Sequence, residues 1–132
     1  MNLKTLYEAA LDVANNAYAP YSNFNVGAAL LLPDGTIQTG INIENRSYGA
    51  TNCAERTAVF SAIAKGYKTF TAIAIATPNA NYPVAPCGIC RQVLTEFAPE
   101  NTPVIFGNTY ENRVETTLGQ LYTYDSLHEL AK

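Results

Sequence analysis

A chain of 132 residues is long enough for one domain, 1–132, with its own hydrophobic core, and too short to suggest two. Its formal net charge is −3 and its eight Lys and Arg residues are scattered, which argues against a nucleic-acid partner. No stretch approaches the roughly 20 apolar residues that span a bilayer, so we expect no membrane partner. With 48% hydrophobic and only 14% charged residues, the composition favours self-association.

Helical and extended patterns alternate along the chain. Apolar residues at helical spacing predict a first helix over 3–19, where Ala19 precedes a proline. Pro33-Asp34-Gly35 is typical of a turn between two strands. The predicted elements are helix 3–19, strands 24–32 and 36–43, helix 52–66, strand 70–76, helix 87–97, strands 103–106 and 113–117, and, from Leu118 onward, a final helix that includes Leu127, Leu130 and Ala131. This order predicts an α/β fold with three layers, α/β/α, around a mixed sheet of about five strands.

The chain contains three cysteines, an odd number for a disulfide framework. Its N-terminal pattern includes Glu8 and Asp12 and so lacks the uninterrupted apolar centre of a secretory signal, which leads us to expect a cytoplasmic location. In a reducing compartment, cysteines are more often metal ligands, catalytic groups or buried apolar side chains than disulfide partners. The three thiols therefore need a chemical interpretation.

Each thiol falls at the predicted start of a helix. Cys87 and Cys90 are three apart, so they lie on one side of a helix and can hold one ion together, while Cys53 arrives from a neighbouring element. Zinc suits such ligands, and three protein ligands with an open fourth position are typical of catalytic zinc. The single histidine, His128, is the alternative fourth ligand of a structural site. We therefore expect one Zn²⁺ per chain, with Arg56 offsetting the excess negative charge of the thiolates.

Glu55 follows Cys53 by two residues, so its carboxylate can point into the cavity beside the metal without binding it. That position suits a proton shuttle. Asn52-x-x-Glu55 also matches a capping box, in which the glutamate bonds back to the cap residue, and the cysteines have a second interpretation as buried apolar side chains. The combination of Cys53-Ala54-Glu55 with Pro86-Cys87-x-x-Cys90 favours the catalytic interpretation.

The motifs C-A-E-R at 53–56 and P-C-G-I-C-R-Q at 86–92 together resemble the cytidine deaminase family, in its short three-cysteine branch. Further similar stretches are Y-S-N-F-N-V-G-A at 21–28 and N-I-E-N at 42–45, so the resemblance covers almost the whole chain. It implies that zinc-bound hydroxide attacks C4 of cytosine while Glu55 protonates N3 and then the leaving ammonia. Cytidine and deoxycytidine would give uridine and deoxyuridine, a reaction of pyrimidine salvage.

The same resemblance implies contacts with a nucleoside substrate. Asn42 and Glu44 would bind the sugar hydroxyls, and Phe24 would lie beside the pyrimidine ring. The backbone around Ala54 and Ala85 would contact the base. From the residues alone, Phe24 is equally a core residue that opens an apolar strand, and the two polar residues are equally solvent-facing residues at a strand end.

The resemblance also implies a homotetramer with active sites near the subunit interfaces, and it matches Arg56 to the family's arginine beside the cysteine ligands. The family's C-terminal phenylalanine, which reaches a neighbouring subunit's pocket, is absent here, and Tyr122 or Tyr124 is its candidate substitute. Arg46 stands where the family usually has a small residue, so subunit contacts or the pocket rim are expected to differ. Arg91, which follows Cys90, is a less certain match to that arginine, and a role at the protein surface is an equal alternative for it.

Two alternative functions remain at this point. One is a deaminase of another aminated nucleoside, such as a nucleoside antibiotic, or of a nucleotide, although Glu44 would repel a nearby 5′-phosphate. The other is a non-catalytic binding module stabilised by zinc, which needs His128 or another group as a fourth ligand.

Overall fold

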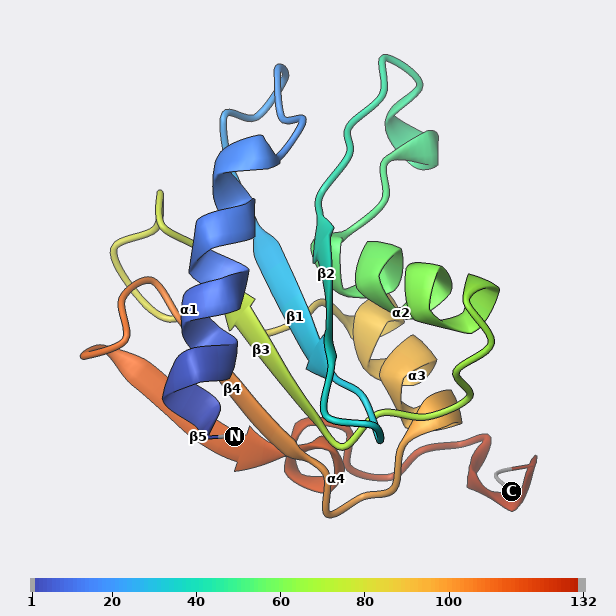
Figure 1. Cartoon of the computed structure of the whole chain (residues 1–132). Helices are drawn as coiled ribbons and strands as arrows, with labels where there is room; N and C mark the ends of the chain where they lie inside the picture. Colours follow the sequence, from blue (N-terminus) through green and yellow to red (C-terminus); the bar gives the residue numbers. More distant parts are fainter. Residues whose placement is uncertain (1, 131–132) are drawn as a thin grey trace.

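The computed structural model describes residues 2–130, in which helices and strands alternate (Figure 1). The α-helices are α1 (Leu3–Val13), α2 (Ala54–Ala64), α3 (Gly88–Phe97) and α4 (Leu118–Leu121). The strands are β1 (Gly27–Leu31), β2 (Ile37–Ile41), β3 (Ala72–Ala76), β4 (Pro103–Gly107) and β5 (Arg113–Thr117). Short 3-10 helices cover Ala14–Asn16, Tyr48–Ala50 and His128–Leu130. None of the helices in 2–130 has the length and apolar character needed to cross a membrane.

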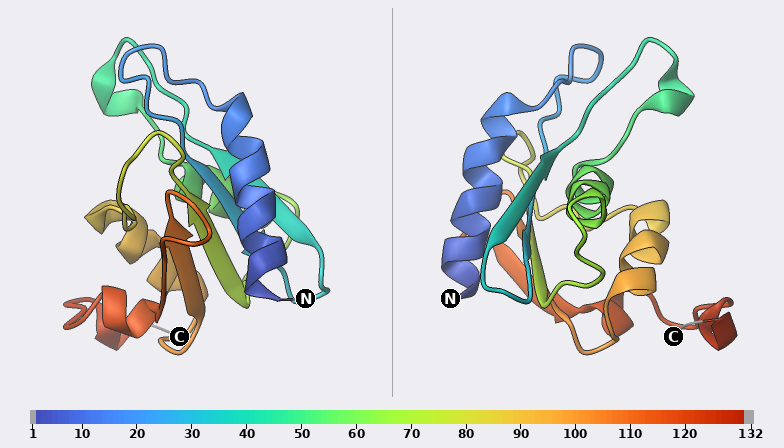
Figure 2. Two further views of the ribbon diagram at one scale, coloured as in Figure 1. Left: turned by 90° about the vertical axis from the view of Figure 1, so that its left-hand side faces the viewer. Right: turned by 45° about the vertical axis from the view of Figure 1, so that its right-hand side comes forward.

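The strands form one mixed sheet in the order β2-β1-β3-β4-β5. Strands β3 and β4 are parallel, because α3 lies in the connection between them, and every other neighbouring pair is antiparallel. Helix α1 covers one face of the sheet, and α2 and α3 cover the other (Figure 2). The predicted three-layer α/β/α arrangement with a five-stranded mixed sheet is confirmed.

The central strand β3 shows why the sheet is covered on both sides. Ile73 and Ile75 belong to the core cluster that includes residues of α2 and α3, whereas Ala72 and Ala74 belong to the cluster that includes residues of α1. Successive side chains of a strand point to opposite faces, so this apolar run supplies two cores at once.

Two glycines let helices approach the sheet backbone. A Cβ atom on Gly40 of β2 would lie 2.4 Å from the backbone nitrogen of Ala58 in α2, and one on Gly27 of β1 would lie 1.9 Å from the carbonyl oxygen of Ala10 in α1. Neither position has room for a side chain. The contact at Gly40 is relevant to the site because α2 begins directly after Cys53.

The first predicted helix is too long. Helix α1 ends at Val13, and the side-chain amide of Asn15 donates to the carbonyl of Asp12 at 3.2 Å, which offers the helix end an alternative to a further turn. The strand predicted from residue 24 begins only at Gly27. Its first residues are held instead by side chains, as described below.

The final helix, predicted from Leu118 onward, is only partly present, because α4 covers Leu118–Leu121 and the part predicted around Leu127 is not an α-helix. Only the 3-10 turn His128–Leu130 forms there, and Leu127 and Leu130 are 49% and 72% exposed, so their spacing does not reflect a buried helix face. Ala131, which the prediction included, lies outside the described residues.

Candidate active site

The N-terminal ends of α2 and α3 bring the three thiols together. Cys53 is the N-cap residue of α2 and Cys87 is the N-cap residue of α3. The Sγ atom of Cys87 lies 3.7 Å from that of Cys53 and 3.2 Å from that of Cys90. All three sulfur atoms lie within 4.8 Å of one another.

This geometry fits one zinc ion. Two thiolates about 2.3 Å from a tetrahedral zinc lie about 3.8 Å apart, close to the two short separations found here. Cys90 is buried and Cys53 partly buried, whereas Cys87 is exposed, so the cluster borders solvent on one side. An ion held by these thiolates therefore has a side on which a fourth ligand can enter.

Among residues 2–130, the group of candidate ligands consists of these three cysteines and contains no histidine. His128 instead lines a hollow together with Phe97 and Ala98, at the end of α3 opposite to Cys87. The alternative in which His128 completes a structural zinc site therefore has no support in this arrangement.

The surroundings favour a thiolate at Cys53, whereas the hydrogen bond with Cys53 and burial raise the pKa of Cys90. Hydrogen bonding with Cys90 and with Arg56 lowers the pKa of Cys53 to about 5, against the opposing effect of burial. The guanidinium of Arg56 donates from Nη2 to Cys53 Sγ at 3.3 Å. The free N–H groups at a helix N-terminus also stabilise negative charge, and two such ends meet here.

Glu55 is buried in the first turn of α2, with 4% of its surface exposed. Burial raises the pKa of its carboxyl to about 7, and the neighbouring Cys53 thiolate adds to the effect, while its own backbone N–H, Cys90 and Arg56 oppose it. The capping-box interpretation is wrong, because the N-cap residue is Cys53 rather than Asn52. The Asn52 side-chain amide donates to Thr57 Oγ1 at 3.1 Å instead.

Asn42 lies just beyond β2 and holds the segment that contains Phe24. Its Oδ1 accepts from the backbone N–H of Val26 at 2.9 Å, and its Nδ2 donates to the carbonyl of Phe24 at 2.7 Å. Asn42 is buried, and Phe24 is half-buried outside any strand. Each polar atom of the amide retains the capacity for one more hydrogen bond.

Glu44 holds the adjoining turn in the same way. Its Oε1 accepts from the backbone N–H groups of Tyr21 and Ser22 at 2.9 and 3.1 Å, and its other oxygen accepts from the Ser22 hydroxyl. The Ser22 hydroxyl in turn accepts from the backbone N–H of Phe24 at 3.1 Å. These hydrogen bonds lower the pKa of Glu44, with the one from the Ser22 hydroxyl contributing most.

The model of the family described as the cytidine and deoxycytidylate deaminase zinc-binding region matches residues 1–106. The chain belongs to this family. Among curated proteins, the cytidine deaminase of Halalkalibacterium halodurans is 47% identical over 121 residues, 92% of this chain and 91% of that protein. The crystal structure of cytidine deaminase from Burkholderia pseudomallei is similar, with a TM-score of 0.89 and 47% identity over 94% of this chain and 98% of that one. Blasticidin-S deaminase of Bacillus cereus is 34% identical over 88% of this chain and 86% of that protein.

The deaminase family model describes a zinc-binding region, and the three-cysteine group fits one such ion, so the cofactor of this chain is zinc. The structure brings Cys53, Cys87, Cys90, Glu55 and Arg56 together as predicted. Ala54 is completely buried.

The role of one side chain of this deaminase chain was not predicted, and a second side chain was left with two alternatives. Ser22, which orients Glu44, had no signal beyond its place in the Y-S-N-F stretch. Arg91 was left between a site role and a surface role, and it bonds two backbone carbonyls from different parts of the chain.

Proposed function

We propose that this protein is a zinc-dependent hydrolase that converts cytidine and deoxycytidine to uridine and deoxyuridine, with release of ammonia. The observation that carries the proposal is the buried carboxyl of Glu55 beside a three-cysteine cluster that borders solvent at Cys87. Family membership and two relatives named cytidine deaminase support the same reaction.

When bound, zinc supplies a Lewis acid that makes a water molecule nucleophilic near neutral pH. In the hydrolysis a bond forms between C4 of the base and the water oxygen, and the bond between C4 and the exocyclic nitrogen breaks. Glu55 takes one proton from the water and gives it to N3. It then takes the proton of the new C4 hydroxyl and gives it to the departing nitrogen, which leaves as ammonia while C4 becomes a carbonyl. Cys53, Cys87 and Cys90 hold the metal, and Arg56 offsets the net negative charge of their thiolates.

Asn42 and Glu44 are proposed to bind the sugar hydroxyls, and Phe24 to lie against the base. The hydrogen bonds to the segment 21–26 fix both polar side chains in place before a ligand arrives. Pre-oriented groups bind with a smaller entropic cost. The backbone of Ala54, at the N-terminus of α2, is proposed to contact the base.

We also propose that the chain assembles as a homotetramer with its sites near subunit interfaces. Tyr122 is occupied within its own chain, where its hydroxyl donates to Gln92 Oε1 at 2.7 Å, whereas Tyr124 is 98% exposed. Tyr124 is therefore the better candidate for reaching a neighbouring site.

Residues 1–132 are proposed to form a single domain, because both core clusters pack on the same sheet. A cytoplasmic location suits a site made of reduced thiols.

The experiment is a substrate panel with zinc-loaded protein, followed by ammonia release. Cytidine and deoxycytidine test the proposal, and cytidine monophosphate is the matched control because it adds only a 5′-phosphate. Blasticidin S tests the alternative of an antibiotic deaminase, which the 34% identical relative favours. Turnover of the two cytosine nucleosides well above the other compounds is expected. Turnover of blasticidin S alone contradicts the proposal. So does a protein that contains zinc but turns over none of the four compounds.

A further inference from the structure

Arg91 occupies the first turn of α3, one residue after Cys90, and it joins two distant segments through their backbones. Its Nε donates to the carbonyl of Pro86 at 2.8 Å, and its Nη1 donates to the carbonyl of Leu121, also at 2.8 Å. The side chain is half-buried. Both distances are those of strong, charge-assisted hydrogen bonds.

The first of these bonds acts on the peptide that enters Cys87. Pro86 is fully buried and directly precedes Cys87, the N-cap residue of α3. Of the three thiols, that of Cys90 is fixed by burial in the core and that of Cys53 by the contact with Arg56, whereas Cys87 is exposed and follows a loop without regular structure. The Cys87 sulfur accepts from the backbone N–H of Cys90 at 3.4 Å, and the bond from Arg91 to Pro86 adds a restraint on the peptide that enters Cys87.

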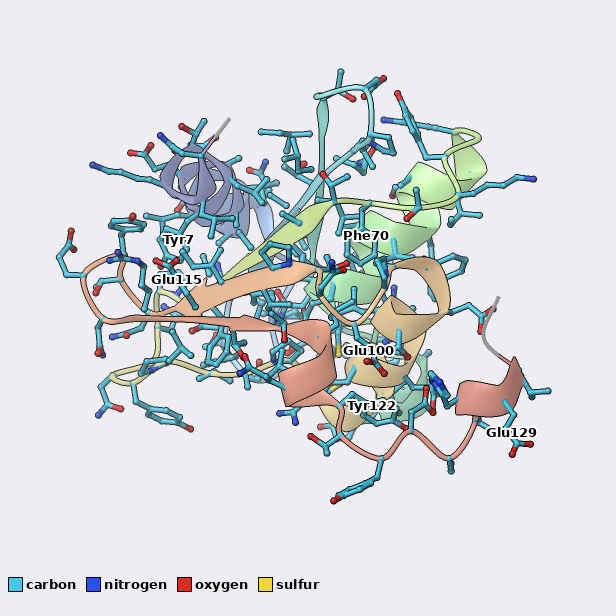
Figure 3. The ribbon with its side chains drawn as sticks, turned by 90° about the horizontal axis from the view of Figure 1, so that it is seen from below. Tyr7, Phe70, Glu100, Glu115, Tyr122 and Glu129 are labelled. Carbon is cyan, nitrogen blue, oxygen red and sulfur yellow. The ribbon has the colours of Figure 1, made fainter. Side chains whose placement is uncertain are left out.

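The second bond acts on the segment after the last strand. Leu121 ends α4, and the next residue, Tyr122, lies against α3 (Figure 3), where its hydroxyl donates to Gln92. Arg91 and Gln92 of α3 thus bind Leu121 and Tyr122, respectively. Among the hydrogen bonds of residues 2–130, those of Arg91 alone connect that segment to the loop that carries Cys87.

We propose that Arg91 is a positioning residue for zinc, which fixes Cys87 through the Pro86 carbonyl while the Leu121 carbonyl holds the guanidinium in place. The residue acts through its partners and touches neither the metal nor the substrate. The inference rests on the proposed zinc site and does not depend on which substrate the protein uses.

The test is the rate of zinc transfer from the loaded protein to a chromophoric chelator. Arg91→Lys keeps the charge but loses the planar fork that reaches two carbonyls, and Arg91→Ala loses both. We expect zinc release at least ~10-fold faster in each variant, the size of effect found when groups that support metal ligands are removed. Cobalt substitution should show an altered thiolate-to-metal absorption band in the same variants.

Tyr122→Phe is the matched control, because it removes a hydrogen bond between the same helix and the same segment without touching the Pro86 carbonyl. Its zinc release should stay within about twofold of the parent protein. A folded Arg91→Lys protein that releases zinc at the parental rate overturns the proposal, as does equal acceleration in Tyr122→Phe. If Arg91→Ala does not fold, Arg91→Lys decides the question.

The two proposals fail in different ways. A protein that deaminates no cytosine nucleoside but loses zinc rapidly as Arg91→Lys refutes the proposed substrate and leaves this inference intact. A cytidine deaminase whose Arg91→Lys variant holds zinc normally refutes the inference alone.

Discussion

Arg56 donates a hydrogen bond to Cys53 at 3.3 Å, from a position three residues further along the chain. Because Cys53 is the N-cap of α2 and Arg56 lies in its first turn, the two side chains face the same way. The guanidinium bonds to the Cys53 sulfur and forms no salt bridge with a carboxylate within residues 2–130. Its charge is placed where three thiolates around a divalent ion leave a net negative charge.

Arg56→Gln is therefore expected to weaken the metal centre, because it removes the charge and keeps much of the length. Zinc release to a chelator should be at least ~10-fold faster, or turnover of zinc-loaded protein at least ~10-fold lower. Arg113→Gln is the control, since it removes an equal charge from β5, where Arg113 pairs with Glu115. Parental zinc release and turnover in Arg56→Gln would show that the charge is not needed.

Cys87→Ala should lose zinc, because two cysteine ligands bind the ion more weakly than three. The expected fall in zinc affinity is at least ~100-fold, measured by competition with a chelator of known affinity. Ile89→Ala is the control, an exposed side chain in the same helical turn. One tightly bound zinc per chain in Cys87→Ala would remove Cys87 from the ligand set.

Ser22→Ala tests whether the hydroxyl that binds Glu44 prepares the sugar contact. Loss of a hydrogen bond to a charged group should raise KM for cytidine about 10-fold with little change in kcat. Thr36→Ala is a matched control, because the Thr36 hydroxyl donates to Asp34 at 2.7 Å in the turn between β1 and β2. An unchanged KM in Ser22→Ala would separate this turn from substrate binding.

Gly40→Ala tests the close contact between β2 and α2. The added Cβ would lie 2.4 Å from the backbone of Ala58, so the helix must shift, and overpacking of this kind costs about 2 kcal/mol. The thermal unfolding midpoint should fall by at least ~4 °C at fixed protein and zinc concentrations. Gly49→Ala, which has open space around it, should leave the midpoint unchanged. Equal midpoints for both variants would mean that α2 accommodates the methyl group.

The grouping of the three thiols was predictable because its signal is local. Cys87 and Cys90 share a helix face by spacing alone, and the start of each helix was marked in the sequence. The layers were predictable for a similar reason, since the apolar run of β3 indicated burial on both faces.

Other features depend on side chains that bind backbone groups. Arg91 binds carbonyls five residues before it and thirty residues after it, and a carbonyl has no residue type that a sequence pattern could reveal. Asn42 holds the backbone at Phe24 and Val26 in the same way, which replaced the strand predicted there. The predicted capping box was wrong because the N-cap residue is Cys53, one residue after the predicted Asn52.

The central claim is that Glu55 moves protons in the hydrolysis of cytidine at a zinc site. The most direct measurement compares ammonia release from cytidine by the parent protein and by Glu55→Gln, after both are shown to contain one zinc per chain. The account predicts that Glu55→Gln keeps its zinc and loses at least ~10²-fold in kcat. Equal kcat in the two zinc-loaded proteins would contradict it.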